Sequence, residues 1–421
     1  MVSSYSNSSE LAYRNNEIVN PKALQPFFEA LKSLEMQKTK TVSIIHIGDS
    51  HIQADFMTSV VRKKMQDCFG NAGRGFVFPY SMAKTNGPLN YGIRFNGKWY
   101  PQRCIYPDTA CNWGLAGITV SSPEDSLFVR VYCNNKTFET YYHDKISVLY
   151  DPTKAQRNIS VFSQGANVIN STNDKKLGIQ TFYFDKLTDT ITVNIRKFDK
   201  TDDQFALQGF ILDNSRPGII ASEVGVNGAT VGAFLQCKNF AKQINYYQPD
   251  LLVLSFGTND IYNTNYNDST FYRHYDSLLT SIRRAMPYTS IVLTTPGDCK
   301  RNRKTTIRAS LAARKIIIAL AKKHNCAIWD FLKVMGGVNS IEHWVANGLG
   351  NGDKIHLSEK GYNLMGSLFY NALAEGYDAH TKGWKVQVIE ENTENIFWYG
   401  LKKHTGHLQL FDPGVKCFCG R

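Results

Sequence analysis

The 421-residue sequence has no long hydrophobic run and no C-x-x-C cysteine pair, and each absence excludes a class of protein. No stretch reaches the roughly 18 uninterrupted apolar residues that a membrane-spanning helix needs. The nine cysteines are scattered without a C-x-x-C pair, so a cysteine metal cage is not expected. Zinc-finger spacings and aromatic RNA-binding motifs are also missing. We therefore expect no integral membrane segment, no metal, no cofactor and no nucleic-acid partner.

The cysteines and the N-terminus leave the cellular compartment open. Cys104 and Cys111 could form a bridge in an oxidising compartment, whereas most of the other cysteines are expected to be buried thiols. The first nine residues are polar and lack the apolar segment of a signal peptide. This start fits either a cytoplasmic protein or a protein whose signal peptide has been removed.

The remaining composition is that of an ordinary globular protein, with 43% hydrophobic and 20% charged residues. The length predicts two or three domains. Lysine and arginine exceed aspartate and glutamate by 48 to 36, a net charge of +12. That balance favours an anionic partner, although a solvated lysine-rich surface explains it equally well. The oligomeric state is not indicated by the sequence.

The N-terminal part predicts the start of an α/β sheet. A helix is expected after Pro21, and residues 42–47 form an apolar run typical of a buried strand. This strand leads directly into Gly48-Asp49-Ser50-His51, and a second helix is expected over about residues 54–68. The order strand, tight turn, helix places these four polar residues at the end of a strand.

Between about residues 76 and 217 the pattern changes to short Val-, Tyr-, Phe- and Thr-rich segments separated by turn residues. This pattern predicts an inserted β-sandwich. Strands are expected at residues 127–132, 145–150, 180–184 and 190–195. Trp99 and Trp113 could form a surface on which sugars stack, although the sandwich core is the expected place for most of these aromatic residues.

Beyond residue 217 strands and helices alternate again, which predicts a parallel sheet with helices on both faces. Strands are expected at 250–256, 290–295 and 327–330, and helices at about 268–285, 305–324 and 359–374. A further strand is expected at 384–389, after which the sequence is irregular.

Polar clusters lie where ligands bind in such a sheet, at the carboxyl ends of the strands. They are Gly48–His51, Gly257–Asp260 and Asp353–Leu357, with Glu223–Thr230 as a fourth. Ser50 is a candidate nucleophile, His356 its candidate base, and Asp353 the carboxylate that would orient the base. Taken singly, each of these motifs is more typical of a helix cap or a surface histidine than of a catalytic site.

Acyl transfer also needs donors for the oxyanion of the tetrahedral intermediate. The Asn259 amide and the backbone N–H groups of Ser50 and Gly228 are the candidates. Glycine at position 228 would let the backbone approach a substrate closely, but it is also typical of a plain turn.

Together these residues resemble the SGNH (GDSL-type) hydrolase family, which is recognised by four short blocks. The blocks match Ser50, Gly228, Asn259 and His356 with Asp353, in the order of the family. The resemblance covers about residues 50–75 and 218–380. It implies a three-layer α/β/α flavodoxin-like fold and ester hydrolysis without a metal.

A narrower resemblance is to the bacterial peptidoglycan O-acetylesterases, in which a carbohydrate-binding-type sandwich is inserted into the hydrolase. His51 follows the nucleophile where many family members carry leucine, and an all-β insertion separates the first two blocks. This resemblance implies removal of acetyl from the 6-hydroxyl of N-acetylmuramic acid, and a periplasmic or cell-surface location. The expected domains are a hydrolase domain at 21–75 and 218–384, an inserted sandwich at 76–217 and a C-terminal extension at 385–421.

The resemblance also implies a mechanism, in which Ser50 attacks the acetyl carbonyl and His356 transfers the proton. Arg301 and Arg303, in the basic loop 300–304, are expected with His51 to contact an anionic glycan, unless the loop is simply a solvated surface. Acetylated xylan and sialic acid remain alternative substrates. A glycan O-acetyltransferase and a catalytically idle glycan-binding protein remain alternative functions.

Overall fold

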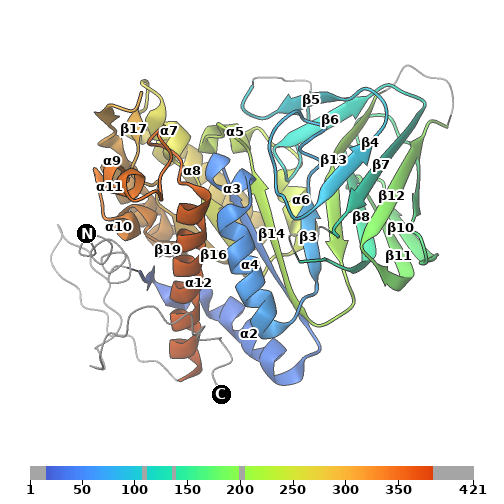
Figure 1. The fold of residues 1–421 in the computed structure, drawn as a ribbon, viewed down its shortest axis with the longest axis horizontal. Helices are drawn as coiled ribbons and strands as arrows, with labels where there is room; N and C mark the ends of the chain where they lie inside the picture. Colours follow the sequence, from blue (N-terminus) through green and yellow to red (C-terminus); the bar gives the residue numbers. More distant parts are fainter. Residues whose placement is uncertain (1–15, 107–110, 135–138, 199–203, 383–421) are drawn as a thin grey trace.

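The computed structural model describes residues 16–106, 111–134, 139–198 and 204–382. It has an α/β/α part, on the left of Figure 1, and a β-sandwich on the right. The strand expected at 384–389 and the expected extension at 385–421 lie outside the described residues. No helix within the described residues combines the length and the apolar composition needed to cross a membrane.

The α/β/α part is built on a six-stranded sheet in the order β1-β19-β16-β15-β2-β14. All neighbouring strands are parallel except β1, which pairs antiparallel with β19. The strands are β1 Ile18–Val19, β2 Thr41–Gly48, β14 Gly218–Gly225, β15 Leu251–Ser255, β16 Ser290–Thr294 and β19 Ala327–Trp329. Gly48 at the end of β2 pairs with Gly225 and Ser255, so these three strands end at the same edge.

Helices cover both faces of this sheet, because residues along each strand point alternately to opposite sides. Leu251 and Val253 of β15 pack in one apolar cluster, and Leu252 and Leu254 in the other. The first cluster includes α2 Gln25–Gln37, α4 Phe56–Phe69 and α12 Glu359–Thr381. The second includes α5 Val231–Leu235, α6 Phe240–Tyr247, α8 Asp268–Ala285 and α9 Ala309–Lys323. Short helices complete this part: η1 Pro21–Leu24, α3 Ser50–Gln53, α7 Thr258–Tyr262, α10 Phe331–Met335 and α11 Ser340–Ala346.

The sandwich consists of a seven-stranded sheet packed on a four-stranded one. The larger sheet has the order β10-β11-β8-β13-β6-β5, with β3 paired to β13, and the smaller has the order β4-β7-β12-β9. The larger sheet contains β3 Gly73–Val77, β5 Tyr100–Arg103, β6 Ile118–Ser122, β8 His143–Tyr150, β10 Val168–Asp174, β11 Ile179–Thr188 and β13 Phe205–Asp213. The smaller contains β4 Gly92–Phe95, β7 Ser126–Tyr132, β9 Asn158–Phe162 and β12 Thr190–Arg196.

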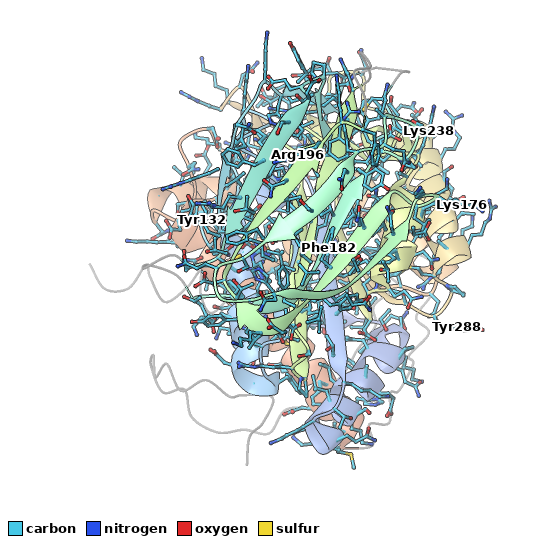
Figure 2. All side chains as sticks on the ribbon, turned by 90° about the vertical axis from the view of Figure 1, so that its right-hand side faces the viewer. Tyr132, Lys176, Phe182, Arg196, Lys238 and Tyr288 are labelled. Carbon is cyan, nitrogen blue, oxygen red and sulfur yellow. The ribbon has the colours of Figure 1, made fainter. Side chains whose placement is uncertain are left out.

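Figure 2 looks onto the sandwich, with Tyr132 and Arg196 on strands of the smaller sheet. Alternate residues of β12 are buried, namely Ile191, Val193 and Ile195, which is the pattern of a strand with one face in the core. Trp99 and Trp113 are also buried, at 5% and 2% exposed. These two tryptophans therefore belong to the interior and do not offer a flat surface to a sugar.

Four charged side chains are buried where the sandwich meets the central sheet. Asp55 directly precedes α4 and Arg62 lies within it. Glu223 lies in β14, and Arg74 lies in β3 of the sandwich. Arg62 is 2.7 Å from both Asp55 and Glu223, and Arg74 is 3.3 Å and 2.9 Å from the same two carboxylates. Asn90 bonds to Arg74 and to Asp55. This group, which we call the junction cluster, ties the two parts together.

The α/β fold with an all-β insertion is as predicted, but two helix boundaries differ. The helix expected at 305–324 begins only at Ala309, because residues 300–306 form a hairpin of β17 Lys300–Arg301 and β18 Thr305–Thr306. The last helix continues to Thr381 rather than ending near residue 374. Cys104 and Cys111, the expected candidates for a bridge, are both buried and are not bridged to each other.

Candidate functional site

Ser50 lies at a sharp turn between β2 and α3, at the carboxyl edge of the sheet. Gly48 permits this turn, because a Cβ there would lie 2.6 Å from Ile52 and 2.7 Å from the Ser255 carbonyl. Asp49 Oδ1 accepts the backbone N–H of His51 at 3.0 Å and so caps α3. The turn therefore presents Ser50 at the sheet edge where bound substrates are expected.

Ser50, His356 and Asp353 form a continuous hydrogen-bonded relay. Ser50 Oγ is 2.9 Å from His356 Nε2, and His356 Nδ1 is 2.8 Å from Asp353 Oδ2. Lys354 has a left-handed backbone with φ of 58°, which folds the chain so that Asp353 reaches back to the imidazole. The structure thus brings together three side chains that are up to 306 residues apart in the chain.

The surroundings of Asp353 keep it ionised. Burial by itself would raise the pKa of Asp353, but hydrogen bonds from His356 and from backbone N–H groups lower it below its usual value. Asp353 Oδ1 accepts the N–H groups of Ile355 at 2.9 Å and His356 at 3.0 Å. An ionised Asp353 accepts a proton-bearing Nδ1, which leaves Nε2 unprotonated and facing Ser50. This is the tautomer in which His356 can act as a base.

The expected oxyanion donors lie at the same edge. Gly228 has φ of 81°, in the region that favours glycine, and precedes the start of α5. Asn259 Nδ2 donates to the Ala229 carbonyl at 3.0 Å and to Asp49 Oδ2 at 3.1 Å. Both amide hydrogens of Asn259 are therefore engaged, so its donation to an oxyanion requires one of these bonds to be exchanged when a substrate binds.

Residues of the sandwich contact the loop that carries Gly228. Gln53 of α3 accepts the N–H of Asn227 at 2.6 Å and donates to the Asn86 carbonyl at 2.6 Å. Asn227 also donates to the Asn86 side chain at 2.8 Å. From another sandwich loop, Ile105 comes within 3.7 Å of the position that a Cβ on Gly228 would occupy. The insertion therefore forms part of the wall beside the predicted oxyanion site.

The three residues expected to contact substrate differ in their surroundings. The ring of His51 lies between Asp49 and the Ile355 carbonyl, with 11% of its side chain exposed. Arg301 donates to the carbonyls of Ile261 and Tyr262 in α7, at 3.1 Å and 3.0 Å. Arg303 lies exposed at the tip of the 300–306 hairpin. Of the three, Arg303 could contact a substrate without the loss of such hydrogen bonds.

We expect Arg301→Gln and Arg303→Gln to affect different quantities. Arg301→Gln removes charged hydrogen bonds to α7, which carries Asn259. This variant should lower the unfolding free energy by about 1–2 kcal/mol, and it should also lower kcat. Arg303→Gln should leave stability within about 0.5 kcal/mol and raise only KM for an anionic polymer at low salt. Urea unfolding and kinetics on the polymer and on a small neutral ester test both expectations. An unchanged polymer KM in Arg303→Gln would identify the hairpin as a solvated loop.

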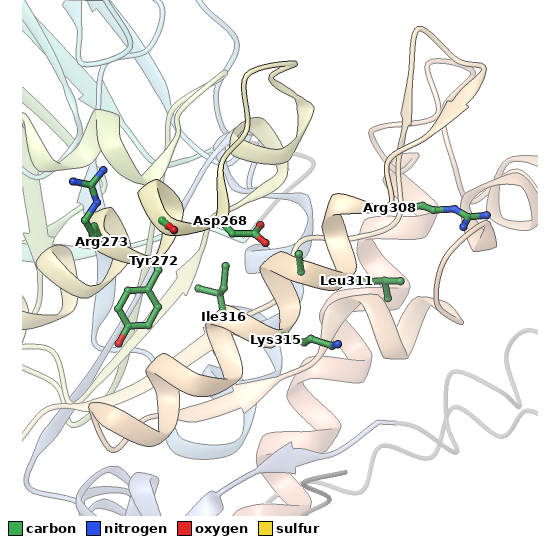
Figure 3. A pocket seen from close by; sticks show the side chains of 9 residues that line it. Asp268, Tyr272, Arg273, Arg308, Leu311, Lys315 and Ile316 are labelled. Atoms are coloured by element: carbon green, nitrogen blue, oxygen red, sulfur yellow. The ribbon is translucent and has the colours of Figure 1, made fainter. Parts of the chain in front are cut away.

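A wide groove of about 730 Å³ lies away from the triad, between α8 and α9 (Figure 3). Its lining includes Asp268, Arg273, Arg308 and Lys315, and none of the triad residues. Figure 3 shows Arg308 and Leu311 pointing outward at the α9 side of this groove. The predicted chemistry therefore does not use this groove. Among the described residues no three His, Cys, Asp or Glu side chains gather in a way that could hold a metal ion.

Comparison with known families gives a match over the second part of the chain. Residues 204–364 match the model of the GDSL-like lipase/acylhydrolase family. The chain carries a GDSL-like acylhydrolase domain. It is accordingly a carboxylic ester hydrolase. The matched range contains Gly228, Asn259, Asp353 and His356, whereas Ser50 lies before the insertion and is brought to the acylhydrolase site by the fold.

Solved structures resemble the acylhydrolase to different extents. A peptidoglycan O-acetylesterase superposes with a TM-score of 0.69 at 22% identity, covering 84% of this chain and 96% of that chain. A lipase/acylhydrolase from Enterococcus faecalis, also at 22% identity, covers 37% of this chain and 75% of its own, with a TM-score of 0.30. A family two carbohydrate esterase from Clostridium thermocellum, at 11% identity, covers 70% of this chain and 100% of its own, with a TM-score of 0.30. No significant match is found among curated proteins.

Some residues of the acylhydrolase site have no counterpart in the sequence-based prediction. Asp49 was expected only as part of a motif, yet it contacts both His51 and Asn259. An aspartate two residues before a helical N–H is a recognisable capping signal, so the contact of Asp49 with His51 could have been predicted from the sequence. Asn86 and Ile105 belong to the sandwich, and no local pattern relates them to Gly228.

Proposed function

We propose that this acylhydrolase is a serine esterase that removes O-acetyl groups from a glycan, with acetylated peptidoglycan as its natural substrate. The observation that carries the proposal is the complete relay from Ser50 through His356 to Asp353 at the carboxyl edge of the sheet. A protein that only binds glycans has no need of such a relay. The N-acetylmuramic acid 6-O-acetyl group is the ester that we assign to Ser50.

In the acylation step Ser50 Oγ attacks the acetyl carbonyl carbon while its proton passes to His356 Nε2. The negative oxygen of the tetrahedral intermediate accepts the N–H groups of Ser50 and Gly228 and the amide of Asn259. The bond between the carbonyl carbon and the sugar oxygen then breaks, and His356 gives its proton to that oxygen. The sugar hydroxyl is released and the acetyl group remains on Ser50.

In the deacylation step a water molecule takes the place of the sugar. His356 Nε2 removes a proton from the water as its oxygen attacks the acetyl carbonyl. The second tetrahedral intermediate collapses, the bond to Ser50 Oγ breaks, and His356 returns the proton to Ser50. Acetate leaves and the resting enzyme is restored. Throughout, Asp353 stabilises the positive charge that appears on His356.

The choice of glycan is supported by the extent of the structural likeness. The similarity to the peptidoglycan O-acetylesterase covers 84% of this chain, so it includes the inserted sandwich as well as the α/β/α part. The contacts of Asn86 and Ile105 beside Gly228 support a role of the insertion in shaping the cleft. A peptidoglycan substrate places the enzyme in the periplasm or at the cell surface. Arg301 and Arg303 then form a basic rim beside a glycan that bears carboxylates.

Acetate release from several acetylated glycans tests the proposal. The enzyme is incubated with O-acetylated peptidoglycan, acetylated xylan and O-acetylated sialic acid, with Ser50→Ala as the blank. We expect serine-dependent acetate from peptidoglycan at a kcat/KM at least about tenfold above the other two substrates. Release from xylan or sialic acid alone would contradict the peptidoglycan assignment. Acetyl transfer to an added sugar acceptor in place of acetate release would identify a transferase, and no turnover at all would identify a glycan-binding protein.

A further inference from the structure

The ring of His51 is held from both sides. His51 Nδ1 is 3.0 Å from Asp49 Oδ1, and His51 Nε2 is 3.3 Å from the carbonyl oxygen of Ile355. The rings of Phe331 in α10 and Tyr362 in α12 lie nearly perpendicular to it, with centroids 6.5 Å and 6.0 Å away. The cavity that His51 lines together with Ser255 has a volume of about 20 Å³, which is too small for a sugar. His51 is therefore held in place by its neighbours.

Both partners of His51 are hydrogen-bond acceptors. A neutral imidazole carries one N–H and one lone pair, so either tautomer would point a lone pair at the carboxylate of Asp49 or at the Ile355 carbonyl. Only the imidazolium has a proton on each nitrogen and satisfies both contacts. The contacts therefore select the charged form of this side chain.

We propose that His51 is a permanent imidazolium that positions the base-bearing loop against the nucleophile. This rests on the proposed function, since it concerns the base of that reaction. His51 bonds to the carbonyl of Ile355, the residue directly before His356, and is itself bonded to the turn that carries Ser50. It thereby links the two halves of the relay independently of the bond between Ser50 and His356.

The ring of His51 also lies beside the ring of the base. The two rings are 5.3 Å apart between centroids and inclined by 34°. The positive charge of His51 is balanced by Asp49, so the imidazolium is not an unpaired buried ion.

The titratable groups placed against His51 come from three elements. Asp49 belongs to the nucleophile turn, Asp353 and His356 to the loop before α12, and Tyr362 to α12 itself. Burial would lower the pKa of His51, but the charge and hydrogen bond of Asp49, the Ile355 carbonyl and the charge of Asp353 raise it above its usual value. The direction agrees with the contacts.

Steady-state kinetics on a small neutral aryl acetate test the role. We expect His51→Leu to lower kcat about tenfold and to change KM far less, since Asp49 and the Ile355 carbonyl lose their donor. The matched control is His343→Gln, at an exposed histidine of α11, which should leave both constants unchanged. A kcat of His51→Leu equal to that of the wild type would overturn the proposal.

Nitrogen NMR of histidine-labelled protein provides a readout without turnover. At pH 8 one of the ten histidines should keep protons on both ring nitrogens, and its signals should vanish in His51→Gln. Signals typical only of neutral rings at this pH would overturn the proposal. If the wild type hydrolyses none of the tested esters, the proposed function is wrong. The NMR result would still determine the charge of His51. A histidine that only fills space would be neutral at this pH and would not give this signal.

Discussion

Replacing His356 with alanine should lower kcat for acetyl ester hydrolysis by roughly 10⁴- to 10⁶-fold. Ser50 Oγ has its base 2.9 Å away in His356 Nε2, and without it the hydroxyl must attack with its proton still attached. The same ring is needed to protonate the departing sugar oxygen. Because acylation and deacylation both depend on this nitrogen, KM should change far less than kcat.

Asp353→Asn should reduce kcat by about 10³- to 10⁴-fold through the tautomer of His356. The backbone N–H groups of Ile355 and His356 both point at Asp353 Oδ1. They would hold the amide oxygen of asparagine at that position and turn its NH₂ group toward His356 Nδ1. The imidazole would then carry its proton on Nε2, facing Ser50, where no lone pair is left to accept the serine proton.

Steady-state kinetics on an aryl acetate, with thermal unfolding as a check on folding, measure both variants. His343→Ala serves as the control, because it removes an exposed histidine that is not part of the relay. The double variant of His356→Ala and Asp353→Asn should be no slower than His356→Ala alone, since the aspartate acts only through the ring. Losses that multiply in the double variant would contradict the relay.

Apolar periodicity explains why the α/β/α part was predictable. Strands of a parallel sheet are buried on both faces and read as continuous apolar runs, as in Leu251–Ser255. The 300–306 hairpin was missed because each of its strands has two residues, too few for an alternating pattern. Strand β10 has no alternating pattern that could predict it, because all seven of its residues are exposed.

The relay was predictable for a different reason. Ser50, Asp353 and His356 each follow or precede a recognisable element, and chemistry restricts which residue types can serve. The contacts of Gln53 with Asn86 and Asn227 could not be predicted in this way, because amide side chains occur at many positions and their type does not identify a particular pair. Likewise, Arg74 and Glu223 are 149 residues apart, and their pairing depends on how the sandwich docks. Sequence patterns indicate local periodicity, which does not depend on polar contacts between residues far apart in the chain.

The junction cluster leads to the largest expected effect on stability. Arg62 donates to both oxygens of Asp55, at 2.8 Å and 2.7 Å, and to Glu223 at 2.7 Å. Burial raises the pKa of Glu223 to about 6, although Arg74 and Arg62 oppose this. Arg62→Met would leave two buried carboxylates with Arg74 as their remaining cation. Removing one partner of a buried ion pair costs about 3–5 kcal/mol of unfolding free energy, and we expect a loss of that size.

Lys63→Met is the matched control for Arg62→Met. Lys63 is the next residue of α4, its side chain is 63% exposed, and its pair with Asp67 is a surface ion pair. Such pairs contribute at most about 1 kcal/mol, so this variant should unfold close to the wild type in urea. The loss in Arg62→Met should shrink at acid pH, where Glu223 takes up a proton and one unpaired charge disappears. A small effect that does not vary with pH would instead mean that solvent reaches the junction cluster and screens its charges.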